Sequence, residues 1–363
     1  MRSKYETLAI RLTDLIHANV KKGIYKLPTE AQLCSRYHVS RQTVRQALAL
    51  LNARGLVVSR QGSGSYATGL SPDPSHNVIG LFIASEHEYV YPELITDIRQ
   101  VLSSHSFSLK VYSTDNLLIR ERESLEDFIA CPLRGLIAEG CKSALPNPNT
   151  DLYEKLHRMD IPILFLHGGC TSLPWAACIK DDNFYGGYLL AQHLWTLGHT
   201  RIAGLFKMDD IQGIERYQGF ITHMRDVGHI VPDDRIGWFT SAEVSALEKK
   251  QDTHFLLEFI QKQLRSCSAL ICYNDEIAYW MIKELLYAGL RVPQDVSVVC
   301  FDNSYLSELS RIRITTLAHK PHEMGSVIAE RILQALQGIP VTSLEIPWEL
   351  VVRESDSPPE SPA

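Results

Sequence analysis

The sequence predicts an α/β protein in which two doubly wound lobes follow a small, mostly helical N-terminal domain. Three observations lead to this prediction. The 363 residues are 45% hydrophobic and 21% charged, the values of a globular chain with about two domains. Residues 1–70 carry 11 Lys and Arg against 3 Asp and Glu, whereas 25 basic and 39 acidic residues follow. From residue 78 onwards, short apolar runs alternate with helical patterns.

Two short helices are predicted in the basic segment. Thr29 can cap a helix that ends near Tyr37, because Gln32 at the third helical position completes a capping box. Ser40 can cap a second helix over residues 41–54, which Gly55 would end in the left-handed conformation. This second helix has an apolar face and, near its N-terminus, a polar face. The apolar residues are Val44, Ala47, Leu48 and Leu51, and the polar ones are Arg41, Gln42, Arg45 and Gln46.

The basic segment has the features of a DNA-binding domain. Two helices joined by a tight turn place the second helix in the major groove, where Arg can bond guanine and Gln can bond adenine. Residues 56–59 and 65–67 then predict a hairpin with a glycine-rich tip over 60–64. A tip without bulky side chains can approach the DNA backbone or enter the minor groove.

Residues 27–30, 39–48, 55–56 and 62–66 resemble the winged helix-turn-helix of the GntR family, and the match extends over nearly all of residues 4–68. By position, the resemblance implies that Glu30 supports the second helix. It also implies that Gln61 and Gly62 contact DNA from the wing, while Lys4 and Tyr5 lie near the phosphates. The residues of the second helix that would face DNA are Arg41, Gln42, Thr43 and Arg45.

The acidic body predicts two parallel sheets covered on both faces by helices. Strands spaced by helices form right-handed βαβ units, and ligands of such sheets bind outside the carboxyl ends of the strands. The predicted strands are residues 78–84, 108–113, 136–139, 163–167, 201–206, 269–273 and 296–301.

The predicted boundaries divide the chain into four segments. The DNA-binding domain covers residues 1–68, and a linker with Pro72 and Pro74 covers 69–77, because neither a helix nor a β-ladder continues through these prolines. The acidic body covers 78–355. A disordered tail is expected over 356–363.

Residues 197–203, 272–278, 292–303 and 349–355 resemble, in the same order, the signatures of the LacI/GalR family of sugar-binding domains. The resemblance implies a two-lobed fold like that of the periplasmic binding proteins, and it implies that residues 78–355 are an effector-binding and dimerisation domain. A GntR-type head on such a body is similar to the arabinose-responsive repressors, which residues 204–213 also resemble. It implies that L-arabinose is the inducer. Because the linker prolines exclude the hinge helix of LacI relatives, the wing would take over its minor-groove contact.

A sugar site needs carboxylates, amides and guanidinium groups for the hydroxyls and an aromatic ring for the apolar face. Polar residues just past strand ends are the candidates, and Arg216 lies on a helix predicted over residues 213–225, with Gln212 at its start. For His167, Lys207 and Asp209 a plain surface position is the alternative. The full set is Glu139, His167, Lys207, Asp209, Gln212, Arg216, Asn274, Asp302 and His319, with Tyr91 or Phe301 as the aromatic wall.

Other conspicuous residues have structural explanations. Asp275 and Asp295 are expected to be helix-start or turn carboxylates, and His199 a helix-terminus residue. The buried-looking Cys272 and Cys300 are expected to be small core residues. The eight cysteines include no C-x-x-C pair, so a structural zinc site is not expected. We find no G-x-S-x-G, P-loop or H-E-x-x-H motif, and we therefore predict no catalytic residue, metal or cofactor.

The sequence therefore predicts a homodimeric transcriptional repressor of arabinose (pentose) utilisation genes that binds two operator half-sites and is released by a sugar. No signal segment or long apolar run is present, so a cytoplasmic protein without membrane contact is expected. The same architecture could respond to another sugar or to a phosphorylated sugar. A sugar-binding protein for transport is disfavoured by the basic head, and a pyridoxal-phosphate enzyme fused to such a head is disfavoured by the motifs of the body.

Overall fold

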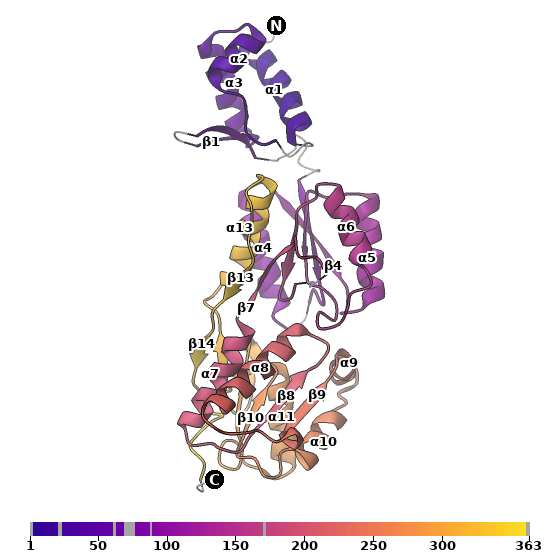
Figure 1. The fold of residues 1–363 in the computed structure, drawn as a ribbon, viewed down its shortest axis with the longest axis vertical. Helices are drawn as coiled ribbons and strands as arrows, with labels where there is room; N and C mark the ends of the chain where they lie inside the picture. Colours follow the sequence, from indigo (N-terminus) through magenta and orange to yellow (C-terminus); the bar gives the residue numbers. More distant parts are fainter. Residues whose placement is uncertain are drawn as a thin grey trace.

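The computed structural model describes residues 3–20, 24–60, 63–68, 77–87, 89–169 and 172–360. The chain folds into a head (residues 3–68), an N-lobe (77–181 and 323–346) and a C-lobe (182–318 and 349–360), which follow one another along the long axis of the molecule (Figure 1). In the ranges just given, no helix is long and apolar enough to cross a membrane.

The head is a three-helix unit with a two-stranded antiparallel wing. The predicted capping box is present, since Thr29 and Gln32 exchange both bonds. Ser40 caps the next helix by accepting from the Thr43 amide at 3.2 Å, and Gly55 adopts a φ of +71° after its end. The sequence argument predicted these features but not the first helix. The elements are α1 (Lys4–Val20), α2 (Glu30–Tyr37), α3 (Arg41–Ala53), β1 (Val57–Arg60) and β2 (Gly64–Ala67).

The N-lobe is a six-stranded parallel sheet in the order β13-β7-β6-β5-β3-β4 with helices on both faces. Its strands are β3 (Val78–Ile83), β4 (Ser108–Ser113), β5 (Gly135–Ala138), β6 (Ile163–Leu166), β7 (Ala177–Asp181) and β13 (Leu344–Ile346). Its helices are α4 (Tyr91–Ser104), α5 (Leu118–Ala130), α6 (Thr150–Arg158) and α13 (Glu323–Leu336).

The C-lobe repeats this plan in the order β14-β12-β11-β10-β8-β9, with only β14 antiparallel. Its strands are β8 (Ile202–Lys207), β9 (Ile236–Phe239), β10 (Ala269–Cys272), β11 (Ser297–Cys300), β12 (Thr315–Ala318) and β14 (Glu349–Val351). Its helices are α7 (Asn183–Thr196), α8 (Ile211–Asp226), the 3₁₀ turn η2 (Asp233–Arg235), α9 (Ser241–Lys250), α10 (His254–Lys262), α11 (Asp275–Tyr287) and α12 (Tyr305–Leu309).

The chain passes between the two lobes three times. These passages follow β7, β12 and β13, so that α13 and β13 return to the N-lobe after most of the C-lobe is complete. Each lobe is therefore built from two separate stretches of sequence, and the three passages form the joint between them.

All seven predicted strands exist, but the sequence argument missed five others. Two of the missed strands include polar residues: β7 ends in Lys180 and Asp181, and β12 begins with Thr315 and Thr316. The other three, β9, β13 and β14, are short strands at the edges of the sheets. The two threonines are nevertheless fully buried. Their burial is possible because neighbouring groups bond them, including the Ser355 hydroxyl that accepts from the Thr315 amide at 2.8 Å.

The C-terminal segment differs from its prediction as a disordered tail. Residues 356–360 pack against the C-lobe: Asp356 lies 2.7 Å from Nε2 of His193, and the Ser357 amide donates to the Ser297 hydroxyl at 3.1 Å. Composition suggested disorder, but buried polar side chains of the sheet need these partners. Residues 361–363, and residues 69–76 of the predicted linker, lie outside the described part of the chain.

Candidate functional site

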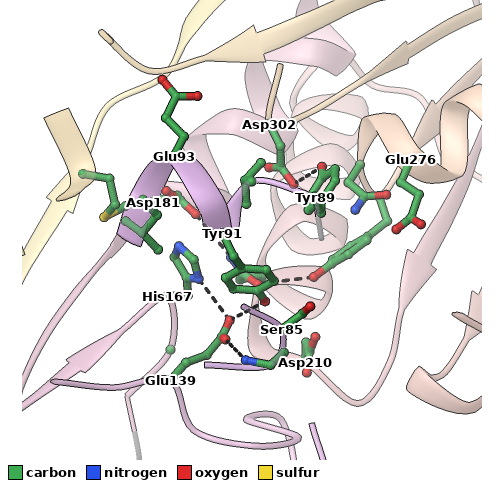
Figure 2. A pocket seen from close by; sticks show the side chains of 18 of the residues that line it. Ser85, Tyr89, Tyr91, Glu93, Glu139, His167, Asp181, Asp210, Glu276 and Asp302 are labelled. Carbon is green, nitrogen blue, oxygen red and sulfur yellow. Dashed lines mark hydrogen bonds and ion pairs between the residues drawn. The ribbon is translucent and has the colours of Figure 1, made fainter. Parts of the chain in front are cut away.

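A cavity of about 520 Å³ lies between the lobes, lined by residues that follow strands of both sheets. Its position agrees with the expectation that ligands bind beyond the carboxyl ends of parallel strands. Figure 2 shows side chains from both lobes converging on it. Of the predicted effector residues, the following line the cavity: Tyr91, Glu139, His167, Lys207, Gln212, Asn274, Asp302 and His319. Their contacts with an effector stay predictions.

Glu139 is the centre of the N-lobe side of the cavity. It accepts hydrogen bonds from the Ala84 amide at 2.9 Å and the Tyr91 hydroxyl at 3.1 Å, and it lies 3.0 Å from Nδ1 of His167 (Figure 2). Burial alone would raise the pKa of Glu139, but the hydrogen bond and charge of His167 lower it below its usual value. These pKa directions favour a carboxylate paired with an imidazolium at neutral pH.

Asp181 organises the side of the cavity near the joint between the lobes. Nε2 of His319 lies 2.7 Å from one carboxylate oxygen, and the Gln212 amide donates to the other at 3.2 Å. Burial would raise the pKa of Asp181, but the His319 bond and the nearby positive charges hold it well below its usual range. His319 also stacks on Trp348 with ring centroids 3.8 Å apart. The indole thereby becomes part of the cavity wall.

Arg216 lies beneath the cavity and is only 1% exposed. It donates to Oδ1 of Asp302 at 2.9 Å and to the Asn183 side chain at 2.9 Å, and a third donation goes to the backbone carbonyl of Tyr273. The guanidinium carbon lies 4.2 Å from the centre of the Phe301 ring. Arg216 therefore holds the carboxylate of Asp302, which reaches the cavity, and the Phe301 ring packs against the Arg216 guanidinium group.

Three predicted effector residues do not line the cavity: Asp209, Arg216 and Phe301. Asp209 is buried and accepts from the Ser241 amide at 3.0 Å, which anchors the start of α9. Arg216 and Phe301 are buried, and Arg216 lies where α8 packs so closely on α7 that a Cβ at Gly187 would collide with the Arg216 backbone. These three residues therefore lie outside the cavity wall, and their predicted contacts with an effector stay predictions.

Several cavity residues escaped the sequence argument. Asp210 forms a 2.6 Å ion pair with Lys207, and Tyr273 donates to the Gln212 side chain at 3.3 Å. Burial would lower the pKa of Lys207, but the Asp210 charge raises it. Asp210 follows Asp209, which was predicted in its place. The polar segment after the predicted strand therefore indicated the right part of the chain but not which aspartate lines the cavity. The missed cavity residues include Tyr89, Asp181, Asp210, Tyr273 and Trp348.

His167 is expected to make the free energy of unfolding depend on pH. Burial alone would lower its pKa, but Glu139 raises it to about 9, against a value of about 6.5 in an unfolded chain. The contribution of the His167–Glu139 pair to the free energy of unfolding is therefore fully present below about pH 6.5 and is lost as the pH rises through about 9. We expect His167→Asn, whose amide can donate to Glu139 without titrating, to remove roughly 3 kcal/mol of this pH-dependent loss. Urea unfolding of both proteins at pH 6.5 and 9 measures the change in unfolding free energy between the two pH values.

The control for this experiment is His105→Asn, because His105 is exposed at the end of α4. This variant should keep the pH dependence of the unmodified protein. An unfolding free energy of His167→Asn that declined with pH as steeply as that of the unmodified protein would contradict the assignment.

The aspartates, histidine and cysteines that were expected to have only structural roles lie in surroundings that agree with those roles. Asp295 pairs with Arg291 at the surface, and His199 lies 2.8 Å from both the Ser268 hydroxyl and the Ser357 carbonyl. Cys272 and Cys300 are fully buried core residues. Asp275 begins α11 as predicted, but it also bonds a side chain of the other lobe.

The predicted DNA-contacting residues gather at the start of α3 and of α1. Arg41 and Gln42 are exposed, whereas the Thr43 hydroxyl lies 2.9 Å from that of Ser40. Arg45 forms a 3.0 Å ion pair with Glu30, an arrangement that would let Glu30 orient it. Lys4 is exposed and Tyr5 half-buried in the first turn of α1, and Gln61 and Gly62 lie outside the described residues. The DNA contacts of all these residues stay predictions.

Comparison with known proteins matches both parts of the chain. Residues 4–66 match the model of the bacterial regulatory proteins of the gntR family, and residues 191–355 match that of the periplasmic binding protein-like domain. The chain is 34% identical to the arabinose metabolism transcriptional repressor of Geobacillus stearothermophilus, over 97% of each sequence. The chain belongs to the arabinose repressor family. The family member of Halalkalibacterium halodurans is 31% identical over 93% of this chain and 90% of that protein.

A solved structure supports the fold of the two lobes. The periplasmic binding protein/LacI transcriptional regulator of Alkaliphilus metalliredigens, complexed with D-xylulofuranose, has a TM-score of 0.64 and 21% identity and covers 77% of this chain and 99% of its own. Membership of the arabinose repressor family makes the protein a sugar-responsive transcriptional repressor rather than an enzyme. The predictions of a GntR-type head and a LacI-type body are confirmed.

Proposed function

We propose that this repressor binds its operator as a homodimer in the cytoplasm and is released by L-arabinose, so that genes for arabinose use are transcribed only when the sugar is present. The name of the two family members supports the choice of arabinose. A dimer places two heads on two half-sites, which requires an operator with matching two-fold symmetry.

The observation that carries the choice of a neutral sugar is the pairing of charges in the cavity. Lys207 pairs with Asp210, His167 with Glu139, His319 with Asp181, and the underlying Arg216 with Asp302, each at 2.6–3.0 Å. A phosphate group needs cationic donors that are not already neutralised. Hydroxyl groups, by contrast, can donate to the remaining carboxylate lone pairs. Two further lysines, Lys249 and Lys320, line the cavity, but so do more carboxylates, among them Glu93, Glu248, Glu276 and Glu323. The paired inner charges and this excess of carboxylates together support a neutral sugar over a phosphorylated one.

Closure of the lobes around the sugar couples the cavity to the DNA-binding head in this proposal. A ligand that binds the closed form better shifts the population toward it, and linkage requires DNA to weaken sugar binding by the same factor. The three passages between the lobes are the places where such a movement is accommodated.

The first experiment is calorimetric titration of the full-length protein with L-arabinose, and with D-xylose, D-ribose, D-galactose and arabinose 5-phosphate as comparisons. We expect selective binding of L-arabinose, because site groups left unpaired by the wrong epimer are costly. Tighter binding of arabinose 5-phosphate, or of another of these sugars, would contradict this choice of effector.

The second experiment measures DNA release. Duplex DNA is selected on the purified protein from a random library, and its affinity is measured by fluorescence anisotropy with and without L-arabinose. A coupling of 1–3 kcal/mol is typical, so we expect a loss of affinity of about tenfold or more. Equal affinity in both conditions would exclude L-arabinose as the inducer, and D-xylose is the control.

A further inference from the structure

Tyr89 joins the two lobes across the cavity. It belongs to the N-lobe segment between β3 and α4, and its hydroxyl lies 2.6 Å from Oδ1 of Asp275 and 2.8 Å from Oδ2 of Asp302. Both carboxylates belong to the C-lobe, at the start of α11 and just after β11. Figure 2 shows Tyr89 beside Asp302, on the side of the cavity away from Glu139.

The neighbouring Tyr91 provides a contrast within the same segment. Its hydroxyl bonds Glu139, which belongs to its own lobe, and this bond can persist whether the lobes are open or closed. The Tyr89 bonds cannot persist when the lobes separate, because donor and acceptors then move apart. Tyr89 also has a φ of +59°, which few non-glycine residues adopt, so its backbone is held in a less favourable conformation while it reaches across.

The two carboxylates that Tyr89 contacts are held firmly by their own lobe. Asp302 accepts from Arg216 through its other oxygen at 2.9 Å. Asp275 is fully buried and accepts from the Ser304 amide and from the Ser307 hydroxyl at 2.7 Å. The acceptors therefore present a fixed target, and one tyrosine proton is shared between two carboxylates. Burial and the charge of Asp302 raise the pKa of Asp275 to about 6.

We propose that Tyr89 is an interlobe latch that sets the affinity of the protein for its effector. The latch bond forms only in the closed form, so it adds to the free energy that favours closure of the effector-free protein and raises the closed fraction. Apparent effector affinity scales with that fraction. Other interlobe hydrogen bonds, such as the one from Asn116 to Ser241 at 2.8 Å, join different loops and do not involve these carboxylates. The effect on affinity rests on the proposed sugar-binding function, whereas the effect on closure does not.

Two variants of the full-length protein test the latch with different expected results. Tyr89→Phe keeps the ring in the cavity wall but removes the bond, and we expect it to raise the dissociation constant for L-arabinose by about tenfold. Asp275→Asn supplies an amide that can donate to the Tyr89 oxygen while Tyr89 donates to Asp302. We expect it to leave the dissociation constant unchanged or lower. Tyr185→Phe, on the exposed side of α7, is the matched control and should behave as the unmodified protein.

Small-angle X-ray scattering without any sugar provides a measurement that does not depend on the effector. We expect a larger radius of gyration for Tyr89→Phe than for the unmodified protein, Asp275→Asn and Tyr185→Phe. Unchanged scattering of Tyr89→Phe overturns the latch, and so does tighter sugar binding, since that result means that the hydroxyl competes with the effector. Failure of the unmodified protein to bind any sugar overturns the proposed effector, and the scattering comparison still decides the latch.

Discussion

Replacement of Arg216 by Met is expected to lower the free energy of unfolding by about 3–5 kcal/mol and to abolish effector binding. The methionine fills much of the space of the side-chain stem but leaves Asp302 without its 2.9 Å ion pair and leaves the Tyr273 carbonyl and the Asn183 side chain without their donor. Removing one partner of a buried pair is costly because the other charge stays buried and uncompensated. Urea unfolding and calorimetric titration with L-arabinose measure the two effects.

The control for this prediction lies on the same helix. Arg225 is 72% exposed and pairs with Asp226 at the surface, so Arg225→Ala should change the unfolding free energy by less than about 0.5 kcal/mol. Arg216→Lys should fall between the two, since it keeps the charge but cannot make all three donations. An Arg216→Met protein as stable as the unmodified one would show that the buried charges are relieved in another way.

Replacement of Arg41 by Ala is expected to weaken operator binding by about tenfold or more and to relax the choice of base at one position of each half-site. Arg41 is the first residue of α3 and is exposed, so its guanidinium can make the paired hydrogen bonds to guanine that are worth about 1–3 kcal/mol. The readout is fluorescence anisotropy with the selected operator and with single-base variants of it.

Arg54→Ala is the matched control for Arg41→Ala, because Arg54 is an exposed arginine at the opposite end of the same helix. Its loss should have a smaller effect that is similar for all sequences. If Arg41→Ala weakened binding to operator and unrelated DNA by the same factor, Arg41 would be a phosphate contact rather than a base contact.

The head was predictable because its signals are local. The capping box of Thr29 and Gln32 and the Ser40 cap depend on residues three apart, and the apolar face of α3 follows the helical repeat. Six of the seven predicted strands are mainly apolar and the seventh, over residues 108–113, alternates apolar and polar residues, both of which are local patterns. By contrast, β12 begins with two threonines whose burial depends on partners far along the chain, such as Ser355. That dependence cannot be seen in a local pattern.

The cavity was predictable only in part for a similar reason. Glu139 and His167 end two predicted strands and Asp302 follows a third, so the rule about carboxyl ends of parallel strands located them. Asp181 follows a strand that was missed, and the cross-cavity contacts of Tyr89 depend on how the two lobes meet. The burial of Arg216 depends on the close approach of α7 and α8 at Gly187. These are properties of packing between elements, which sequence spacing does not specify.

The three passages of the chain between the lobes also constrain how the protein is made. Residue 344 of β13 pairs with residue 179 of β7, and α13 packs on α4, although nearly the whole C-lobe separates them in sequence. A ribosome must therefore synthesise most of the C-lobe before β13 can complete the N-lobe sheet and before α13 can cover the apolar face of α4. The two lobes mature together, and the effector cavity comes into existence only near the end of synthesis.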